Sequence, residues 1–212
     1  MKTAIIGLGN IGTQVANNLI AGGERVIVAD RGATTAQEFA KASEGKAQAL
    51  PVADAIAETD IIVLAIWFDA IKALLSEHRT GLSGKILVDP SNPIAPDGAG
   101  GFKKTIPENQ SSGRVIAGLL PPGARLVKAF GTLGAASLRS GARQAPDPKV
   151  LFYASDDRDA GNAVAELIKA SGFAPIRIGG IDQSIRIEVF GDLHEFGKLG
   201  KLVTAKEAAA LV

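Results

Sequence analysis

The sequence predicts an α/β protein with a doubly wound, mostly parallel sheet that carries helices on both faces. Short runs of branched apolar residues alternate along the chain with segments of helical length. The runs are continuously apolar rather than alternating, which is typical of strands buried on both faces. A glycine-rich turn joins the first run to the first helical segment. Repeated strand–helix–strand units of this kind build a parallel sheet through right-handed crossovers.

The predicted elements start at the first residues of the chain. The segments expected to be strands share short length and apolar character, and they are 2–7, 25–30, 61–65, 85–89, 126–130, 150–154 and 174–178. The segments between them that are expected to be helices are 11–21, 35–43, 68–75 and 159–171. In the last of these, Ala163, Leu167 and Ala170 share one helical face, as expected of a helix packed on a sheet.

Two stretches interrupt this alternation. Residues 90–113 are rich in Pro, Gly, Asn and Ser and are too long for a simple connection, which is typical of a functional loop. After Gly179-Gly180 the strand pattern ends, and 184–196 and 205–211 have the pattern of helices. We therefore expect a sheet domain over residues 1–180. A helical C-terminal segment over 181–212 would pack on that domain or on a partner subunit.

Composition excludes several classes of function. The chain has 23 Lys+Arg against 22 Asp+Glu, so its net charge of +1 argues against a nucleic-acid or membrane-surface partner. It has no Cys and two His, which argues against thiol catalysis, disulfides and a metal site. The longest apolar run, 61–68, is too short to span a bilayer, and the first residues do not resemble a secretory signal. The sequence therefore predicts a cytoplasmic protein.

The turn after the first strand has the pattern of a dinucleotide-binding motif. Gly7, Gly9 and Gly12 form GxGxxG between a predicted strand and a predicted helix. The first glycine permits the tight turn, the second lets the backbone approach a pyrophosphate, and the third lets the helix pack on the strand. The alternative is a purely structural turn, but the context favours a Rossmann-type nucleotide site. The residues predicted to hold the pyrophosphate are Gly7, Leu8, Gly9, Asn10, Ile11 and Gly12.

The end of the second strand bears on the choice of nucleotide. Asp30 follows that strand, where an acidic residue typically binds the ribose hydroxyls of NAD and repels a 2′-phosphate. Arg31 follows at once, and a guanidinium there would grip such a phosphate or stack on adenine. The two side chains favour different cofactors. The residues alone lean towards NAD and leave NADP open.

Four segments, in order along the chain, resemble a known family. They are the GLGNIG turn at 7–12, the strand 61–65 leading into Ile-Trp-Phe-Asp, the Asp-Pro-Ser-Asn-Pro segment at 89–93, and Val-Lys-Ala-Phe-Gly-Thr-Leu at 127–133. Together they resemble the coenzyme F420-dependent NADP oxidoreductase family, whose dinucleotide-binding domain is also found in metalloreductases. Where the family commonly has Ser-Arg or Asn-Arg, this chain has Asp30-Arg31. It also has Gly131 and Gly134 where the family has Asn and Pro.

The resemblance implies roles for positions beyond the turn. Ala65, Ile66 and Trp67 would line the nicotinamide ribose, and Asn92 and Pro93 would lie beside the nicotinamide ring. Residues 130–133 would form the floor under the second redox partner. The loop 98–104 would reach the tail of that partner, with Lys103 and Lys104 facing its negative charges.

These expectations predict an NAD(P)-dependent oxidoreductase that transfers hydride to or from a planar acceptor such as coenzyme F420 or a flavin. Such a transfer needs orientation and a dry pocket more than an acid/base pair. Thr132 is the candidate to hydrogen-bond the acceptor, with a purely structural turn as the alternative. His194, expected on a surface helix of the tail, is a second candidate that would close over the site.

Two other functions remain open from the sequence. One is a non-catalytic redox sensor that binds the dinucleotide, and the other is a small hydroxyacid or imino-acid dehydrogenase. The latter is disfavoured because such enzymes carry a large helical domain after the sheet. The tail also has more apolar residues than one short helix needs (Ile185, Ile187, Val189, Leu193 and Phe196), which predicts a homodimer.

Overall fold

The computed structural model describes residues 1–211 and confirms the doubly wound α/β fold. Its main sheet has six parallel strands in the order β3-β2-β1-β4-β5-β8. The strands are β1 (Thr3–Ile6), β2 (Val26–Ala29), β3 (Ala47–Ala49), β4 (Ile61–Leu64), β5 (Ile86–Asp89) and β8 (Arg125–Lys128). The strand order reverses between β1 and β4. A crevice at the carboxyl ends of strands on either side of such a reversal is where open α/β sheets bind ligands.

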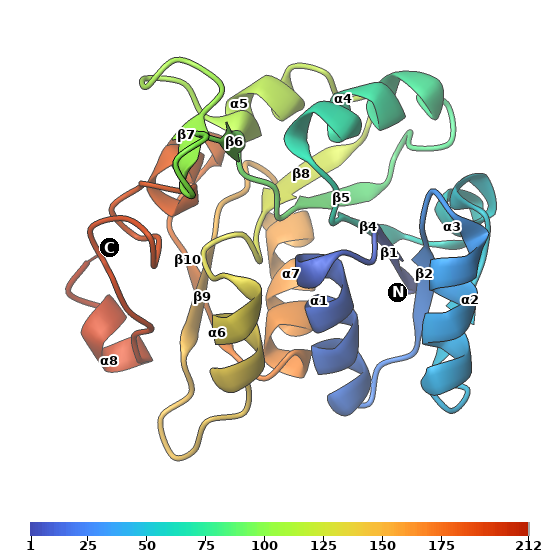
Figure 1. The fold of residues 1–212 in the computed structure, drawn as a ribbon, viewed down its shortest axis with the longest axis horizontal. Helices are drawn as coiled ribbons and strands as arrows, with labels where there is room; N and C mark the ends of the chain where they lie inside the picture. Colours follow the sequence, from blue (N-terminus) through green and yellow to red (C-terminus); the bar gives the residue numbers. More distant parts are fainter. Residues whose placement is uncertain (212) are drawn as a thin grey trace.

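Helices cover both faces of the sheet (Figure 1). One face carries α1 (Asn10–Ala21), α2 (Ala33–Ala42), α6 (Ala135–Ser140) and α7 (Arg158–Ala170). The other carries α3 (Val52–Glu58), α4 (Phe68–Glu77) and α5 (Ser112–Ala117).

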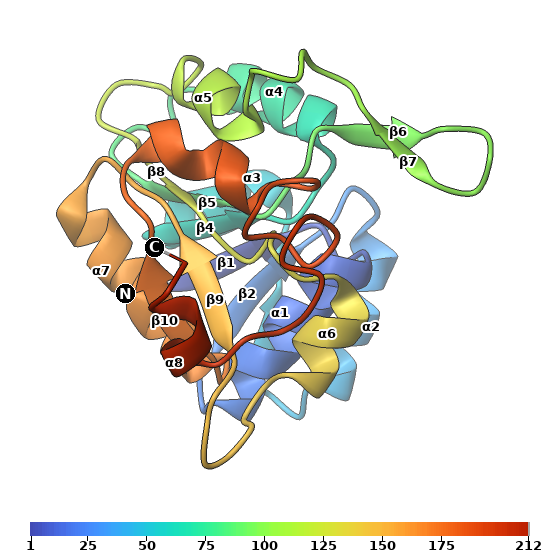
Figure 2. The same cartoon turned by 90° about the vertical axis from the view of Figure 1, so that its left-hand side faces the viewer.

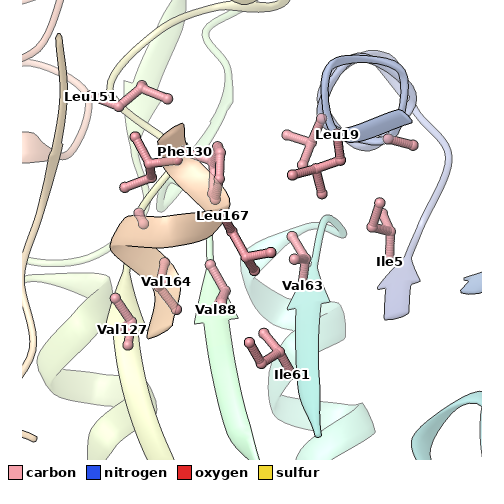
Figure 3. Packing of buried hydrophobic residues seen from close by; sticks show 14 of the residues in the cluster. Ile5, Leu19, Ile61, Val63, Val88, Val127, Phe130, Leu151, Val164 and Leu167 are labelled. Carbon is pink, nitrogen blue, oxygen red and sulfur yellow. The ribbon is translucent and has the colours of Figure 1, made fainter. Parts of the chain in front are cut away.

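Alternate residues of each strand supply the two cores. Ile5 and Val63 pack with Leu19 and Leu167 of α1 and α7, as Figure 3 shows, whereas Leu64 packs on the opposite face. Because successive strand side chains point to opposite faces, only a continuously apolar strand can serve both cores. This packing is the physical basis of the apolar runs seen in the sequence.

Two smaller sheets complete the fold. β9 (Val150–Tyr153) and β10 (Ala174–Arg177) form a parallel pair, joined to β8 by two backbone hydrogen bonds between Lys128 and Ala154, at 2.9 and 3.0 Å. β6 (Ile94–Pro96) and β7 (Phe102–Lys104) form an antiparallel hairpin that extends away from the body of the molecule (Figure 2). The predicted long loop therefore contains this hairpin, and α5 begins at the last two residues of the loop. Neither was expected from the sequence.

The C-terminal tail differs from its prediction. A 3₁₀ helix, η1 (Ile181–Ile187), and the one-turn α8 (Ala205–Ala208) replace the helices expected over 184–196 and 205–211. Phe190 has a φ of +73°, and a Cβ on Gly197 would overlap the Gly191 carbonyl, so the chain turns sharply there. A continuous helix through this stretch is incompatible with the positive φ of Phe190 and with the close approach of Gly197 to Gly191. The helical period of the apolar residues was therefore a misleading signal.

The tail covers the outer face of β9. Ile187, Leu193 and Val203 are buried there with Phe152, and the Val150 N–H donates to the Val203 carbonyl at 2.9 Å. Two of the apolar residues that favoured a homodimer are therefore buried within the chain itself. No helix in residues 1–211 combines the length and the apolar character that crossing a membrane would require.

Candidate functional site

The glycine-rich turn has the geometry that its sequence predicts. Gly7 has a φ of +95°, which favours glycine, and a Cβ at this position would overlap the Ala65 carbonyl. A Cβ on Gly12 would overlap the Gly7 carbonyl. A Cβ on Gly9, by contrast, would find no atom within 4 Å. Gly7 and Gly12 are thus required by the fold, whereas Gly9 faces open space at the N-terminus of α1, where a phosphate group fits.

The carboxylate of Asp30 lies against this turn. Its Oδ2 accepts a hydrogen bond from the Leu8 N–H at 2.9 Å, and its Oδ1 accepts from the Arg31 N–H at 2.6 Å. The Arg31 side chain is exposed to solvent. Two backbone donors therefore fix the negative charge of Asp30 between the pyrophosphate turn and the start of α2. A ribose hydroxyl is expected at this place.

A cavity of about 530 Å³ opens at the carboxyl edge of the sheet beside the turn. It brings together the ends of β1, β4, β5 and β8, and the predicted residues that line it are Gly9, Asn10, Ile11, Ala65, Ile66, Trp67, Asn92 and His194. Its volume is in the range that holds a small organic ligand. Residues far apart in the sequence thus form one site.

Other predicted residues lie outside the lining. Three residues of the glycine-rich turn, Gly7, Leu8 and Gly12, do not line the cavity. Pro93 does not line it either, and its carbonyl accepts a hydrogen bond from the Thr105 N–H at 2.7 Å at the base of the hairpin. Asp30, Arg31 and Thr132 do not line the cavity either. Lining residues that had no role assigned from the sequence are Pro90, Ser91, Ile94, Val189, Phe190 and Phe196, whereas Phe102 belongs to the loop 98–104 expected near the second partner. Pro90 and Ser91 lie within a motif already noted. The family resemblance placed the loop 98–104 near the second partner, and His194 was expected to close over the site, but nothing in the sequence indicated the other tail residues of the lining.

The Gly131 carbonyl joins three parts of the wall. It accepts hydrogen bonds from Asn92 Nδ2 at 3.1 Å and from His194 Nε2 at 2.9 Å. Asn92 Oδ1 in turn accepts from the Val189 N–H at 2.7 Å. The amide of Asn92 therefore ties the segment after β5 to the segment after β8 and to the tail. This arrangement holds the cavity wall in one geometry.

His194 is buried, not on the surface of a helix as expected. Its side chain is 1% exposed, and it lies in an irregular part of the tail. Nδ1 accepts a hydrogen bond from the Phe196 N–H at 2.9 Å, so the ring proton belongs on Nε2, which donates to Gly131. Burial lowers the pKa of His194 to about 4, although the Gly131 hydrogen bond opposes this shift. At neutral pH the imidazole is therefore an uncharged donor.

Two buried hydroxyls near the cavity have no hydrogen-bond partner. They belong to Ser91 and Thr132, which are 7% and 2% exposed. The Thr132 carbonyl accepts from the Glu195 N–H at 3.2 Å, so its backbone ties the tail to the strand end while its side chain stays unpaired. Buried hydroxyls without a partner are unusual.

A buried ionic network lies behind the wall. Lys128 Nζ donates to Asp89 Oδ2 and to Ser112 Oγ, both at 2.8 Å, and to the Ser91 carbonyl at 2.5 Å. Glu188, at the start of the irregular tail, accepts from the Ser112 N–H at 2.9 Å at the beginning of α5. The network fixes the segment after β5 and the root of the tail relative to each other. Nothing in the sequence pattern indicated it.

Comparisons with known proteins agree with this site. Residues 2–93 match the model of the family described as NADP oxidoreductase, coenzyme F420-dependent. An F420-dependent NADP reductase of Methanothermobacter thermautotrophicus is 30% identical over 205 residues, which cover 89% of this chain and 85% of the relative. A solved structure of a hypothetical protein from Sinorhizobium meliloti is 30% identical, with a TM-score of 0.84 over 96% of this chain and 95% of that one.

A metalloreductase of Rattus norvegicus, STEAP3, is also similar. It is 28% identical over 187 residues, which cover 88% of this chain but 36% of the relative. The chain thus spans little more than a third of that protein. The family is assigned from the Methanothermobacter reductase, because that similarity extends over most of both chains. On these grounds the chain belongs to the F420-dependent NADP oxidoreductase family.

Proposed function

We propose that this oxidoreductase binds a nicotinamide dinucleotide across the carboxyl edge of the sheet and transfers hydride between it and a flat redox acceptor, such as coenzyme F420 or a flavin. The observation that carries the proposal is the open space over Gly9 at the N-terminus of α1, continuous with the cavity that Asn10 and Ile11 also line. A pyrophosphate on that turn directs the rest of the dinucleotide towards the cavity.

The bound nicotinamide would supply or receive the hydride, which carries two electrons and one proton, while a second proton exchanges with water. The protein's part is to bind, orient and exclude water. Ala65 and Ile66 give the cavity an apolar side after β4, and Leu133 gives it one after β8. Among the residues of 1–211 that line it, there is no carboxylate or lysine to form an acid/base pair. Orientation in a dry pocket is sufficient for such a transfer.

Features of the site bear on whether it binds NAD or NADP. The names of the relatives favour NADP, whereas the carboxylate of Asp30 at the expected ribose position favours NAD. Because α2 has no acidic residue in its first turn and Arg31 is exposed beside it, a 2′-phosphate can still be held there. We propose that both dinucleotides bind and that the Asp30 carboxylate lowers the affinity for NADP relative to that for NAD.

The test is a pair of glycine variants. Gly9→Ala adds a methyl group into open space, so the fold should persist while the phosphate is pushed away. Gly118→Ala is the matched control, because its Cβ would also meet no atom closer than 3.5 Å but lies at the end of α5. Calorimetry should show dinucleotide affinity at least about tenfold weaker for the first variant alone, since backbone contact with the pyrophosphate is lost. Equal affinity in both variants would overturn the proposal.

A homodimer remains a proposal, supported by Phe196, the most exposed of the five apolar tail residues noted in the sequence. Phe196 is 63% exposed, although Ile187 and Leu193 are not available to a partner. Light scattering at micromolar concentration decides the matter, and a monomer would contradict the proposal. A cytoplasmic location also remains a prediction from the sequence.

A further inference from the structure

The cavity has no charged wall. Among the residues of 1–211 that line it, there is no Lys, Arg, Asp or Glu, and the titratable side chain is His194, whose pKa burial lowers to about 4. Away from the N-terminus of α1 at Gly9, an anionic group inside would lose hydration and gain no ion-pair partner, which is unfavourable. Whatever part of a ligand fills the cavity is therefore recognised by shape, apolar contact and hydrogen bonds to neutral groups.

Exposed aromatic side chains surround this cavity. Trp67 after β4, Phe102 in β7, and Phe190 and Phe196 in the tail all line it, and each is between 50% and 63% exposed. Large aromatic side chains rarely stay this exposed together without a binding role. Their flat faces offer stacking surfaces to a flat ring.

The cations close in the chain to these aromatic residues lie outside the cavity lining. Lys198, two residues after Phe196, is exposed to solvent, and Lys104 and Arg186 are already engaged. Lys104 Nζ donates to the carbonyls of Glu108 and Gln110 at 2.9 and 2.8 Å. Arg186 pairs with Asp192 at 2.8 Å. Lys103 follows Phe102 in a strand, so its side chain points away from the hairpin face on which the Phe102 side chain lies. None of these cations lines the cavity, although Lys103 and Lys104 were expected to meet a charged tail.

We infer that the protein recognises its redox acceptor by the ring system alone and leaves any charged tail in solvent. The inference rests on the proposed function and specifies the substrate class of the same site as flat heteroaromatic rings, with or without an anionic substituent. A flavin nucleoside should therefore serve as well as its phosphate ester. A deazaflavin without its phosphate and glutamate tail should serve as well as coenzyme F420.

The test compares acceptors that differ only in the tail. NADPH oxidation is followed at 340 nm with riboflavin against FMN, and with F420 against the same deazaflavin lacking its tail. Removing a charged hydrogen-bond partner ordinarily costs about tenfold or more in kcat/KM. The inference expects a preference of less than about fivefold within each pair. A larger preference for the tailed member of either pair overturns it.

A designed cation provides an independent check. Phe102→Lys places a positive charge beside the cavity, and Phe102→Gln removes the same ring without adding charge. The ratio of kcat/KM for FMN to that for riboflavin should rise at least about fivefold in the lysine variant relative to the glutamine variant. An unchanged ratio contradicts the placement of the acceptor beside Phe102. A fold defect common to both variants would not move this ratio.

The two proposals fail in different ways. Calorimetry with NADP⁺ or NAD⁺ alone tests the dinucleotide site without any acceptor, and absence of binding overturns the proposed function. Dinucleotide binding together with a strong preference for tailed acceptors overturns only the inference about the ring. If the dinucleotide binds but none of the four acceptors is reduced, both the proposed hydride transfer and the inference are overturned.

Discussion

Acidification should destabilise the protein through His194. Its folded-state pKa of about 4 lies below the ordinary value of 6.5, so the unfolded chain binds a proton more readily than the folded one. The resulting stability is present above pH 6.5 and is lost as the pH falls from there towards 4. With 1.36 kcal/mol per pKa unit, the full loss is about 3 kcal/mol, of which about 2 kcal/mol is lost between pH 7 and pH 5.

The structural reason is the donor that faces Nδ1. Protonation would direct an N–H at the Phe196 N–H, which now donates to that nitrogen at 2.9 Å, and would place a cation in a buried site. Breaking this contact would also loosen the hydrogen bond to Gly131 and with it the wall of the cavity.

Urea unfolding of the wild type and of His194→Gln at pH 7, 6, 5 and 4.5 measures the effect. The glutamine keeps an amide donor for Gly131 but does not titrate, so the pH dependence of the carboxylates cancels in the difference between the two proteins. The wild type should lose about 2 kcal/mol more than the variant between pH 7 and pH 5. Parallel curves would refute the assignment of a buried neutral imidazole.

Three further substitutions test other parts of the molecule. Asp30→Ala should raise the ratio of NADPH to NADH affinity about fivefold, from about 1 kcal/mol of lost repulsion, and an unmoved ratio in calorimetry would contradict the role given to this carboxylate. Arg143→Met should lower the free energy of unfolding by about 2 kcal/mol, because its Nη2 donates to the carbonyls of Asn18 and Ala170 at 2.6 and 2.7 Å and so caps α1 and α7. Lys128→Met should cost about 3–5 kcal/mol in urea unfolding, because it leaves the Asp89 carboxylate buried without its cation. A loss under 1 kcal/mol there would show that this network does not stabilise the fold.

The sequence by itself determined most of the main sheet, the four longest helices (α1, α2, α4 and α7) and the nucleotide turn. These features depend on local signals, because a strand buried on both faces must be apolar throughout and a turn such as that at Gly7 favours glycine. The predicted bounds of β1, β4 and α1 differ from the observed ones by a residue or two. Short elements such as β3 and α6 were not predicted, because segments of three and six residues show too little hydrophobic periodicity to be recognised.

Only the tertiary structure decided how the tail meets the site. Glu188, Val189 and His194 pair with groups 60 to 100 residues earlier in the chain, and no local pattern encodes partners at such separations. Because of the same contacts, the predicted helix over 184–196 does not form, and the histidine expected on its surface is buried. A helical period reports which side chains are apolar, but donors and acceptors placed by the rest of the fold determine whether the backbone stays helical.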